Sequence, residues 1–298
     1  MLDLRNLETF VRVARLGGFG AAALKLNTTQ PAISARIALL ERDLGTRLFE
    51  RKPRAIALTA KGLELLDYAE RMLSLRADIL RAVGDPASLK GVLRLGVPET
   101  IVHTWLADLA ERINAIYPSV ALDIEVDAVD DLHAALVSDN LDIAVLFGPV
   151  IDPRLKSAPL CSYPLMWFAS TKLDLPQPRP SLADVARWPI ITFRRQSAPY
   201  LALRRHLAKS GLPDARLFGS SSIAAIVRMA LDGVGPCVLP KVVVERELRA
   251  GSLRLLDIPH ELPPITFDVS YMPKPDSYLA AAVAELTLAA ASDYGEGE

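Results

Sequence analysis

Apolar residues recur at intervals of three and four along the first part of the chain, a period that predicts amphipathic helices. The predicted helices cover about 6–16, 20–26 and 28–44, and Asn6 is placed to cap the first of them. Pro31 falls in the first turn of the third helix, where backbone amides have no helical partner and proline is tolerated. We therefore expect three short helices in succession, separated by short turns.

The third predicted helix has one apolar and one polar face. Its inward positions are Ile33, Ile37, Leu40 and Leu44, and its outward positions near the start are Gln30, Ser34, Ala35 and Arg36. Within 48–59, two short extended pieces then flank a basic turn with a proline, as in a β-wing. This layout predicts a winged helix-turn-helix, a motif whose second helix can lie in the major groove of DNA.

A longer helix is predicted from a Thr59 cap to about Val83. Its apolar residues form two adjacent columns at seven-residue spacing, made of Leu65, Leu66, Ala69, Met72, Leu73, Ile79 and Leu80. Such a stripe is typical of a seam between two helices, and the alternative is packing against the protein's own body. We favour dimerisation, because a lone helix between two domains has little else to cover its stripe.

Residues 84–91 are predicted to form a hinge, because a Gly-Asp-Pro run interrupts the long helix. Beyond it the pattern alternates strand and helix, as in α/β domains. Strands are expected at about 92–97, 120–126, 141–147, 190–193, 215–218, 236–239 and 265–271, and a last helix at 277–291 with a frayed polar tail after it. Asp130 or Asp131 is placed to cap one helix. Ser181 and Asp184 are spaced as a capping box.

The chain is long enough for two or three domains, and its formal net charge is only −1. The charge is unevenly distributed: residues 1–61 hold 11 Lys and Arg against 5 Asp and Glu, and the remainder holds 23 against 30. A basic amino-terminal module on a mildly acidic body is the asymmetry expected where one part of a protein meets phosphate. The near-zero total therefore does not argue against a nucleic-acid partner.

Few residues point to catalysis or metal binding. Cys161 and Cys237 lie far apart and in no CxxC motif, so two reduced, buried thiols are expected. The histidines lack metal-ligand spacing, and the chain has neither a GxSxG motif nor a P-loop. No signal-peptide pattern opens the chain, and no apolar run reaches membrane-spanning length. We expect a soluble, cytoplasmic protein that is not an enzyme and needs neither a metal nor another cofactor.

The first part of the chain resembles the LysR-type transcriptional regulators in order, spacing and identity of residues. The matching positions are Leu7-Glu8-Thr9-Phe10, Gly18-Phe19, Ala21-Ala22, Leu26, Thr29-Gln30-Pro31-Ala32-Ile33-Ser34, Ile37, Leu40-Glu41, Leu44-Gly45, Leu48-Phe49-Glu50-Arg51, Leu58-Thr59 and Gly62. The rest of the chain is similar to the family more loosely, with landmarks at 93–96, 117–118, 141–144 and 233–240.

The resemblance implies an α/β multidomain protein: a winged helix-turn-helix DNA-binding domain at 1–61, a linker and dimerisation helix with a hinge at 62–90, and an effector-binding domain at 91–298. The effector domain is implied to have two α/β lobes, like type 2 periplasmic binding proteins, with lobe I at about 91–162 and 266–298 and lobe II at about 163–265. The implied assembly is a homodimer, and further a homotetramer, on double-stranded promoter DNA. We expect a small-molecule effector in the inter-lobe cleft to change promoter binding or bending.

Gly18 and Gly20 depart from the family pattern, which usually has hydroxyl residues around the start of the second helix. Glycine is an acceptable helix cap, so the expected cost in stability is about a few tenths of a kcal/mol. A hydroxyl contact to phosphate is lost there, which removes positioning but leaves base readout in place.

The outward residues of the third helix and the basic wing are the predicted DNA contacts. They are Thr29, Gln30, Pro31, Ser34, Arg36, Arg51, Lys52 and Arg54. Gln30 can pair bidentately with adenine, and Ser34 can bond base edges or a phosphate. Arg36 can take guanine or a phosphate, and the wing residues are expected to meet the backbone or the minor groove. For each, the alternative is an ordinary solvated side chain.

Effector contacts are predicted at the carboxyl ends of the strands, where ligands bind in open α/β sheets. The candidates are Pro98, Glu99, Thr100, Phe147, Gly148, Phe193, Arg194, Ser221 and Ser222. Hydroxyls at helix starts, with Arg194 as a clamp, suit the carboxylate of a small organic acid, although helix capping alone also explains them. Glu99 would repel such a ligand, so either it points to solvent or the ligand carries a cationic or hydroxyl group.

A transport binding protein is the main rival to a regulator, because the residues after 91 resemble that architecture and fold does not fix function. The attached helix-turn-helix and the missing signal pattern argue against export. The sequence therefore favours a ligand-responsive DNA-binding regulator.

Overall fold

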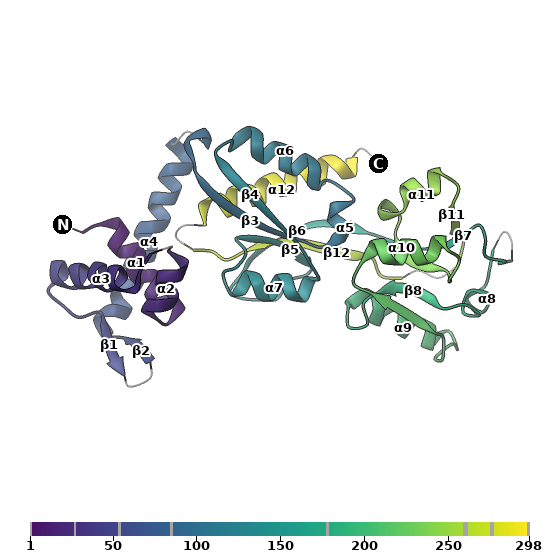
Figure 1. The fold of residues 1–298 in the computed structure, drawn as a ribbon, viewed down its shortest axis with the longest axis horizontal. Helices are drawn as coiled ribbons and strands as arrows, with labels where there is room; N and C mark the ends of the chain where they lie inside the picture. Colours follow the sequence, from purple (N-terminus) through teal and green to yellow (C-terminus); the bar gives the residue numbers. More distant parts are fainter. Residues whose placement is uncertain are drawn as a thin grey trace. The chain divides into compact units, whose positions relative to one another are not determined.

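The computed structural model describes residues 2–26, 28–52, 55–83, 86–176, 179–258, 262–274 and 277–296, with the backbone alone at 51, 52, 55, 77, 78, 80–82 and 296. The chain divides into two compact units, Met1–Pro86 with Pro273–Leu279 and Ala87–Met272 with Ala280–Glu298. Figure 1 shows the elements of each unit. In the described part of the chain, no helix combines the length and the apolar character needed to cross a membrane.

The N-terminal unit is a winged helix-turn-helix followed by a long helix. Its elements are α1 (Leu4–Leu16), α2 (Phe19–Lys25), α3 (Gln30–Leu44), β1 (Phe49–Lys52), β2 (Ala55–Leu58) and α4 (Ala60–Val83). The strands β1 and β2 pair antiparallel, from Phe49 opposite Leu58 to Lys52 opposite Ala55. The three helices and the wing that periodicity predicts are all present.

The first helix begins earlier than predicted. Asp3 caps α1, because its carboxylate accepts a hydrogen bond from the Arg5 amide at 2.8 Å. Asn6, the predicted cap, lies inside the helix and is buried. Gly17 ends the helix at φ 67°, in the left-handed region that glycine adopts without strain.

Contacts within one core hold α3 and the wing together. Phe49 of β1 lies 5.4 Å from Phe10 of α1 and 5.8 Å from Phe19 of α2, measured between ring centroids. The Glu41 carboxylate of α3 accepts a hydrogen bond from the Leu48 amide at 2.7 Å, just before the wing. The position of the wing therefore depends on side chains from all three short helices.

Thr59 and Gly62 shape the start of α4. The Thr59 hydroxyl accepts a hydrogen bond from the Gly62 amide at 2.9 Å and donates one to the Arg47 carbonyl at 2.8 Å, as expected of the predicted cap. A Cβ at Gly62 would lie 2.2 Å from the Leu48 carbonyl oxygen, so only glycine lets the helix pass this closely.

The predicted apolar stripe of α4 divides between two surroundings. Ala69 and Leu73 are buried in the core of the N-terminal unit, and Leu65 and Leu66 pack against that core half-buried. For Ala69 and Leu73 the prediction of an open dimer seam is wrong, because both are buried in one core with residues of α1, α2 and α3. The alternative, packing against the protein's own body, holds for this half of the stripe.

The neighbouring side of α4 is apolar and exposed. Its side chains are exposed by 57% at Tyr68, 43% at Met72, 61% at Leu75 and 54% at Ile79. Their spacing of four, three and four residues places them on one helix face, and we call them the exposed α4 stripe. Met72 and Ile79 belong to the predicted seam, whereas Tyr68 and Leu75 were missed. The side chain of Leu80 lies outside the described part.

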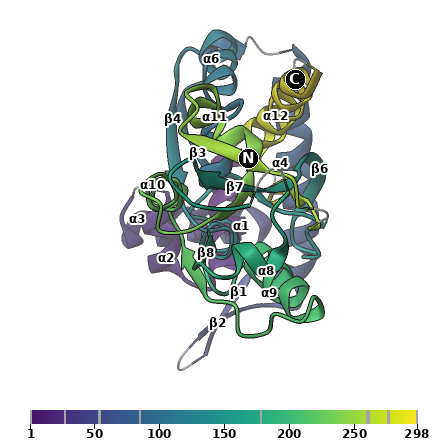
Figure 2. The same ribbon diagram turned by 90° about the vertical axis from the view of Figure 1, so that its right-hand side faces the viewer.

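The second unit contains two five-stranded sheets, each with its own helices. The first sheet has the strand order β4-β3-β5-β12-β6, and we call its half of the unit lobe I. Its elements are η1 (Pro86–Ser88), β3 (Gly91–Val97), α5 (Glu99–Val102), α6 (Leu106–Ile116), β4 (Val120–Val126), α7 (Val129–Val137), β5 (Ile143–Phe147), β6 (Lys156–Tyr163), β12 (Ile265–Tyr271) and α12 (Tyr278–Glu296). Helices α6 and α12 lie on one side of this sheet and α7 on the other (Figure 1). Figure 2 shows α6 and α12 from a second direction.

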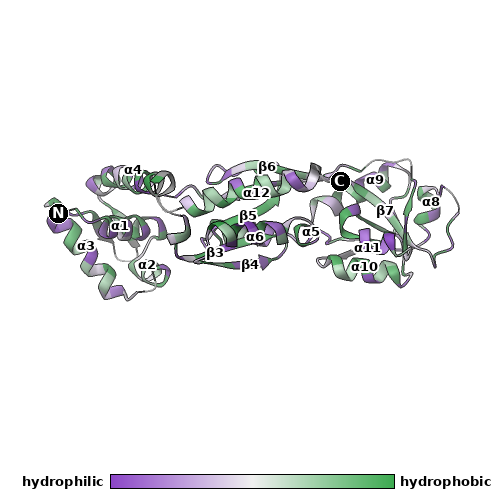
Figure 3. Cartoon of the chain, turned by 90° about the horizontal axis from the view of Figure 1, so that it is seen from above, coloured by the Kyte–Doolittle hydropathy of each residue, from purple (hydrophilic) through white to green (hydrophobic). Residues whose placement is uncertain are grey.

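The second sheet has the strand order β11-β7-β10-β8-β9 and forms lobe II. Its elements are β7 (Leu165–Ser170), α8 (Leu182–Val185), β8 (Ile190–Phe193), α9 (Ala198–Lys209), β9 (Leu217–Ser220), α10 (Ile223–Leu231), β10 (Cys237–Pro240), η2 (Lys241–Val243), α11 (Glu245–Arg249) and β11 (Leu253–Leu256). The strands β5 and β7 are almost wholly buried and are coloured hydrophobic in Figure 3. Two α/β lobes are therefore present, as the resemblance implies.

Two predicted helix caps have different outcomes. Ala128 caps α7, so the prediction of an Asp130 or Asp131 cap is wrong, and both aspartates lie in the first turn instead. Ser181 and Asp184 form the predicted capping box. The Ser181 hydroxyl donates to Asp184 and holds the pKa of that carboxyl below its usual value.

The last helix is longer than predicted. It continues to Glu296, so the expectation of fraying from Ser292 is wrong for the described residues. An ion pair holds this part of the helix in place: the Asp293 carboxylate lies 2.8 Å from the Arg112 guanidinium of α6. The sequence pattern gives no sign of this contact, because its partner lies on a distant helix.

Candidate functional site

Helix α3 presents the side chains predicted to meet DNA. Gln30 and Ser34 are exposed and Arg36 is half-buried, while the inward positions through Leu40 are buried. Leu44, predicted to point inward, is 40% exposed, because the buried face of α3 ends one turn earlier. The polar face of α3 is therefore open to a partner.

The N-terminus of α3 is also open. Thr29, the residue before the helix, makes no side-chain hydrogen bond to the first turn, and Pro31 follows at its second position. Both residues are exposed. Beside them lies Gly20 of α2, where a Cβ would be 3.7 Å from Gln30 Oε1. The first amides of α3 and its positive dipole end can therefore receive an anion.

The wing carries the remaining predicted DNA contacts. The backbones of Arg51 and Lys52 lie on β1, paired with Ile56 and Ala55 of β2. Arg54 lies outside the described residues. Contact of these side chains with phosphate or with the minor groove stays a prediction.

The predicted effector residues lie at the carboxyl ends of parallel strands. In lobe I, β3 pairs in parallel with β4 and β5, and in lobe II, β8 pairs in parallel with β9 and β10. In each sheet the strand order therefore reverses beside the first of these strands, β3 in lobe I and β8 in lobe II. Ligands of open α/β sheets bind at such a reversal, outside the carboxyl ends of the strands. Pro98 is buried after β3, Phe147 and Phe193 are the last residues of β5 and β8, and Ser221 and Ser222 follow β9.

Glu99 links the two lobes. Its Oε2 accepts a hydrogen bond from the Ile223 amide at 2.6 Å, and its Oε1 accepts one from the Ala224 amide at 3.0 Å. The Ala225 amide, third in the same turn, donates to the Ser222 hydroxyl at 3.3 Å. The chain's own oxygens thus satisfy all three free amides at the start of α10. The alternative in which Glu99 points to solvent is therefore wrong, because the carboxylate points at a helix end. The other alternative, a ligand with a cationic or hydroxyl group, stays a prediction.

Arg194 forms a second link between the lobes. Its Nη2 lies 2.5 Å from the Asp130 carboxylate and its Nη1 lies 3.4 Å from the Asp131 carboxylate. Both aspartates belong to the first turn of α7 in lobe I. The guanidinium predicted to clamp a ligand carboxylate is therefore paired with acids of the chain.

The hydroxyls predicted to face a ligand have different surroundings. Thr100 is only 3% exposed, in the short helix α5. Ser222 caps α10, which is the alternative to a ligand role that the sequence allowed. Ser221 is exposed. None of these placements tests contact with an effector, which stays a prediction.

Phe147 and Gly148 line a cavity of about 180 Å³ together with α9 of lobe II and the segment before β12. A Cβ at Gly148 would lie 2.2 Å from Asp268 Oδ1, so glycine is needed at this strand end. Phe193 packs against the core of lobe II, and Trp167 is buried on β7. The predicted residues therefore line the cavity in part only.

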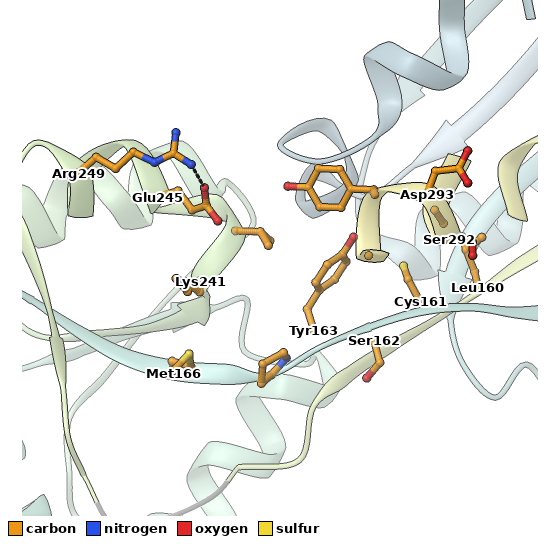
Figure 4. A pocket seen from close by; sticks show the side chains of 15 residues that line it. Leu160, Cys161, Ser162, Tyr163, Met166, Lys241, Glu245, Arg249, Ser292 and Asp293 are labelled. Carbon is orange, nitrogen blue, oxygen red and sulfur yellow. Dashed lines mark hydrogen bonds and ion pairs between the residues drawn. The ribbon is translucent and has the colours of Figure 1, made fainter. Parts of the chain in front are cut away.

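A larger cavity, of about 1010 Å³, was not predicted from the sequence. It lies where β6 passes into β7, and its walls include the carboxyl end of α12 and the segment from η2 to α11 (Figure 4). Cys161, Tyr163 and Lys241 line it, with Arg249 held by Glu245 at 2.6 Å. Burial raises the pKa of Cys161 to about 11 and raises that of Tyr163 too, so both are neutral near pH 7. No motif marks this cavity, because its walls come from three distant segments.

Both cysteines are free thiols. Cys237 is buried, which raises its pKa to about 12, whereas Cys161 is only half-buried, so the expectation of two buried thiols is wrong for Cys161. Among the residues that the structure describes, no group of three or more His, Cys, Asp or Glu side chains is placed to hold a metal ion. His133 lies 3.1 Å from Asp152, whose pKa Arg154 holds well below its usual value. His133 therefore has a structural partner.

Two family models match the chain. One is described as "Bacterial regulatory helix-turn-helix protein, lysR family" and matches residues 4–63. The other is described as "LysR substrate binding domain" and matches residues 86–292. Together they cover the winged helix-turn-helix and both lobes.

Curated relatives and a solved structure agree with these matches. The HTH-type transcriptional regulator GltR of Bacillus subtilis (strain 168) is 28% identical over 253 residues, which are 85% of this chain and 84% of GltR. The SDS degradation transcriptional activation protein of Pseudomonas sp. (strain ATCC 19151) is 32% identical, over 87% of this chain and 85% of its own. Full-length LysG of Corynebacterium glutamicum, with bound effector Arg, shares the fold at TM-score 0.61 and 18% identity, over 98% of this chain and 99% of LysG.

Proposed function

The chain belongs to the LysR family of bacterial transcriptional regulators, and we propose that it binds promoter DNA as a homo-oligomer under the control of a small effector. One observation carries the proposal: a single chain joins an α3 with an open, polar N-terminal face to a two-lobed α/β domain. The relatives named above are transcriptional regulators, not enzymes. Such a protein works in the cytoplasm, where its DNA is.

On DNA, α3 lies in the major groove. Gln30 pairs with adenine and Ser34 bonds a base edge or a phosphate, because both are exposed near the start of the helix. Thr29 and Pro31 stand at the open helix end, which receives a backbone phosphate. Arg36 and the wing residues Arg51, Lys52 and Arg54 add charge to the same contact.

The effector lies in the cleft where the carboxyl ends of the strands of both lobes meet. Pro98, Phe147 and Phe193 supply apolar walls, and Gly148 lets the ligand approach the backbone. The links made by Glu99 and Arg194 hold the two lobes together without a ligand. An effector changes promoter binding or bending only through its different affinity for the states in which these links are made and broken.

The oligomer forms through α4. The exposed α4 stripe has the four-and-three spacing of a helix-pairing seam, and a second copy of the same helix covers it. The resulting homodimer presents two copies of α3 to the two half-sites of a promoter. Two dimers form the homotetramer.

Salt-dependent binding of the full-length chain to the DNA upstream of its own gene tests the function. We expect the logarithm of the binding constant to fall linearly with that of salt concentration. Gln30→Ala should reduce discrimination between this DNA and an unrelated duplex by about 1–3 kcal/mol for the base that it reads. Arg54→Ala should weaken binding to both duplexes alike and lower the salt slope by about one.

The contradicting outcomes are specific. A chain that binds no DNA at low salt is not a regulator of this kind. An equal loss on both duplexes for Gln30→Ala removes its role in base readout. A response to a small molecule that leaves DNA affinity and bending unchanged removes the effector from the mechanism.

A further inference from the structure

The start of α10 already carries an anion, and that anion belongs to the chain. The Glu99 carboxylate takes the Ile223 and Ala224 amides with one oxygen each, and Ser222 takes the next amide. A helix N-terminus is where the carboxylate of a ligand would otherwise bind, because its amides are free and its dipole end is positive. At α10 no first-turn amide remains free for such a ligand.

A ligand carboxylate can reach this helix end only by displacing Glu99. If Glu99 stayed nearby, two carboxylates would share one short row of amides and repel each other. If Glu99 moved away, its two hydrogen bonds would be lost. The link between the lobes would be lost with them, since Glu99 and Ile223 lie 124 positions apart in the chain and belong to different lobes. Either route weakens the binding of an acid.

The second cation of the cleft is also committed. Arg194 pairs with Asp130 and Asp131 across the same cleft, so its charge is already matched by two acids of lobe I. A carboxylate arriving there meets two like charges. The cleft therefore has its predicted anion-binding groups, but the chain's own acids fill them.

We propose that Glu99 determines effector specificity by keeping carboxylates off the N-terminus of α10. The selected effectors are those that place no carboxylate at this position. This replaces the organic acid predicted from the hydroxyls and the arginine. Rejection by an internal group of like charge is an established route to selectivity in binding sites. The inference rests on the proposed effector cleft, and its test below needs no DNA.

The test is calorimetric titration of the full-length protein with sodium acetate and sodium benzoate at constant ionic strength. Glu99→Ala should bind these carboxylates about tenfold more tightly than the wild type. The reason is that two of the three amides at the start of α10 lose their acceptor and can then bind an anion. Glu99→Ser serves as a second shortened variant, in case the alanine variant is poorly folded.

A proline locates the new binding. Ala224→Pro, added to Glu99→Ala, deletes one of the freed amides and should return carboxylate affinity toward that of the wild type. The exchange suits the helix, because α3 and α9 already carry a proline, Pro31 and Pro199, in the same first turn. Ala224 is exposed, so the ring meets no core side chain.

Glu125→Ala is the matched charge control. Glu125 is an exposed acid of β4 in the same lobe, and its removal changes the net charge equally without freeing an amide of α10. We expect no gain in carboxylate binding from it. An equal gain would mean that overall charge, and not the helix end, governs the effect.

Three results would overturn the inference. The wild type could bind the carboxylates as tightly as Glu99→Ala. Folded Glu99→Ala and Glu99→Ser could both gain nothing. The gain could survive Ala224→Pro, which would place the anion elsewhere. If the wild type did not bind DNA, that result would contradict the proposed function, but the carboxylate titrations would still test the role of Glu99.

Discussion

Two helix N-termini in this molecule treat anions in opposite ways. At α3, Thr29 makes no side-chain hydrogen bond to the first turn, and a Cβ at Gly20 of α2 would lie 3.7 Å from Gln30 Oε1. At α10, Glu99 and Ser222 satisfy every free amide of the first turn. The same backbone chemistry is left open at α3 in one unit and links the two lobes at α10 in the other.

The difference shows that a helix end becomes a site or a joint according to what reaches it from elsewhere in the chain. Both helices start after polar residues, and both carry a hydroxyl residue at the cap. Among the residues that the structure describes, an acid from a distant strand end lies within hydrogen-bond distance of the second helix start only. Local sequence alone therefore cannot tell the two ends apart.

The largest effect is expected from disrupting the hydrophobic core on which α3 packs. Phe10→Ala removes a fully buried ring that lies 5.4 Å from Phe49, so it should lower the stability of the N-terminal unit by about 3–5 kcal/mol and abolish DNA binding. Chemical denaturation followed by far-UV circular dichroism measures the loss. Leu24→Ala, at a side chain that is 82% exposed, should stay within about 0.5 kcal/mol of the wild type. Equal stability of the two variants would contradict the packing described.

The next largest effect is expected on dimerisation, which decides how many copies of α3 one assembly presents. Ile79→Glu places a charge in the exposed α4 stripe and should raise the dissociation constant of the dimer at least about tenfold, because the charge must be buried on association. Sedimentation equilibrium measures it. Ser74→Glu, exposed on another side of α4, is the matched control and should leave the dimer intact. A dimer that survives Ile79→Glu unchanged would place the seam elsewhere.

Gly20→Glu tests the comparison itself, because it would place a carboxylate over α3 as Glu99 lies over α10. DNA affinity should fall about tenfold and the salt slope should decrease, since the added acid competes with phosphate for the same amides. Gly20→Gln has nearly the same size without the charge, and space for a Cβ exists there. It should keep most of the affinity. Equal losses for the two variants would indicate a steric cause.

The smallest effect is expected on thiol reactivity, which tests whether α10 stays packed on the core of lobe II. Cys237 lies in the same core as Ile223 of α10, and burial raises the pKa of Cys161 to about 11 and of Cys237 to about 12. Cys237 should therefore react with iodoacetamide near neutral pH far more slowly than in urea. The burial of the two neutral thiols favours the folded state below the ordinary thiol pKa of 9.0. That contribution is lost as pH rises through the raised values. Unfolding experiments at increasing pH measure this loss, and equal Cys237 rates in buffer and urea would contradict its burial.

The N-terminal unit could be predicted almost completely from the sequence. Its helices are contiguous, its inward residues Ile33, Ile37 and Leu40 follow one period, and Gly17 and Gly45 end α1 and α3 with positive φ. The outward face of α3 follows from the same period. Prediction failed where a side chain has a choice of partners, as with Leu73 of α4, which is buried in the core of its own unit.

The strand ends at the proposed effector cleft could be predicted from the sequence, but their partners could not. The strands themselves are visible in the alternating pattern, and Pro98, Phe147 and Phe193 lie at or just after their ends. The partner of Glu99 is not visible, because it lies on a helix of the other lobe. The larger cavity beside Cys161 and Tyr163 was missed for the same reason, since segments distant in sequence form its walls.

The sequence by itself determined the helices and wing of the N-terminal unit, part of the strands of the second unit and the polar face of α3, because hydrophobic periodicity, capping residues and glycine act within a few residues of each other. It did not indicate β6, β7 or β11. Tertiary structure alone decided that α10 is filled while α3 is open. Hydrogen bonds and ion pairs depend on distances of about 3 Å, and only the packing of the lobes brings Glu99 and Asp130 that close to Ile223 and Arg194.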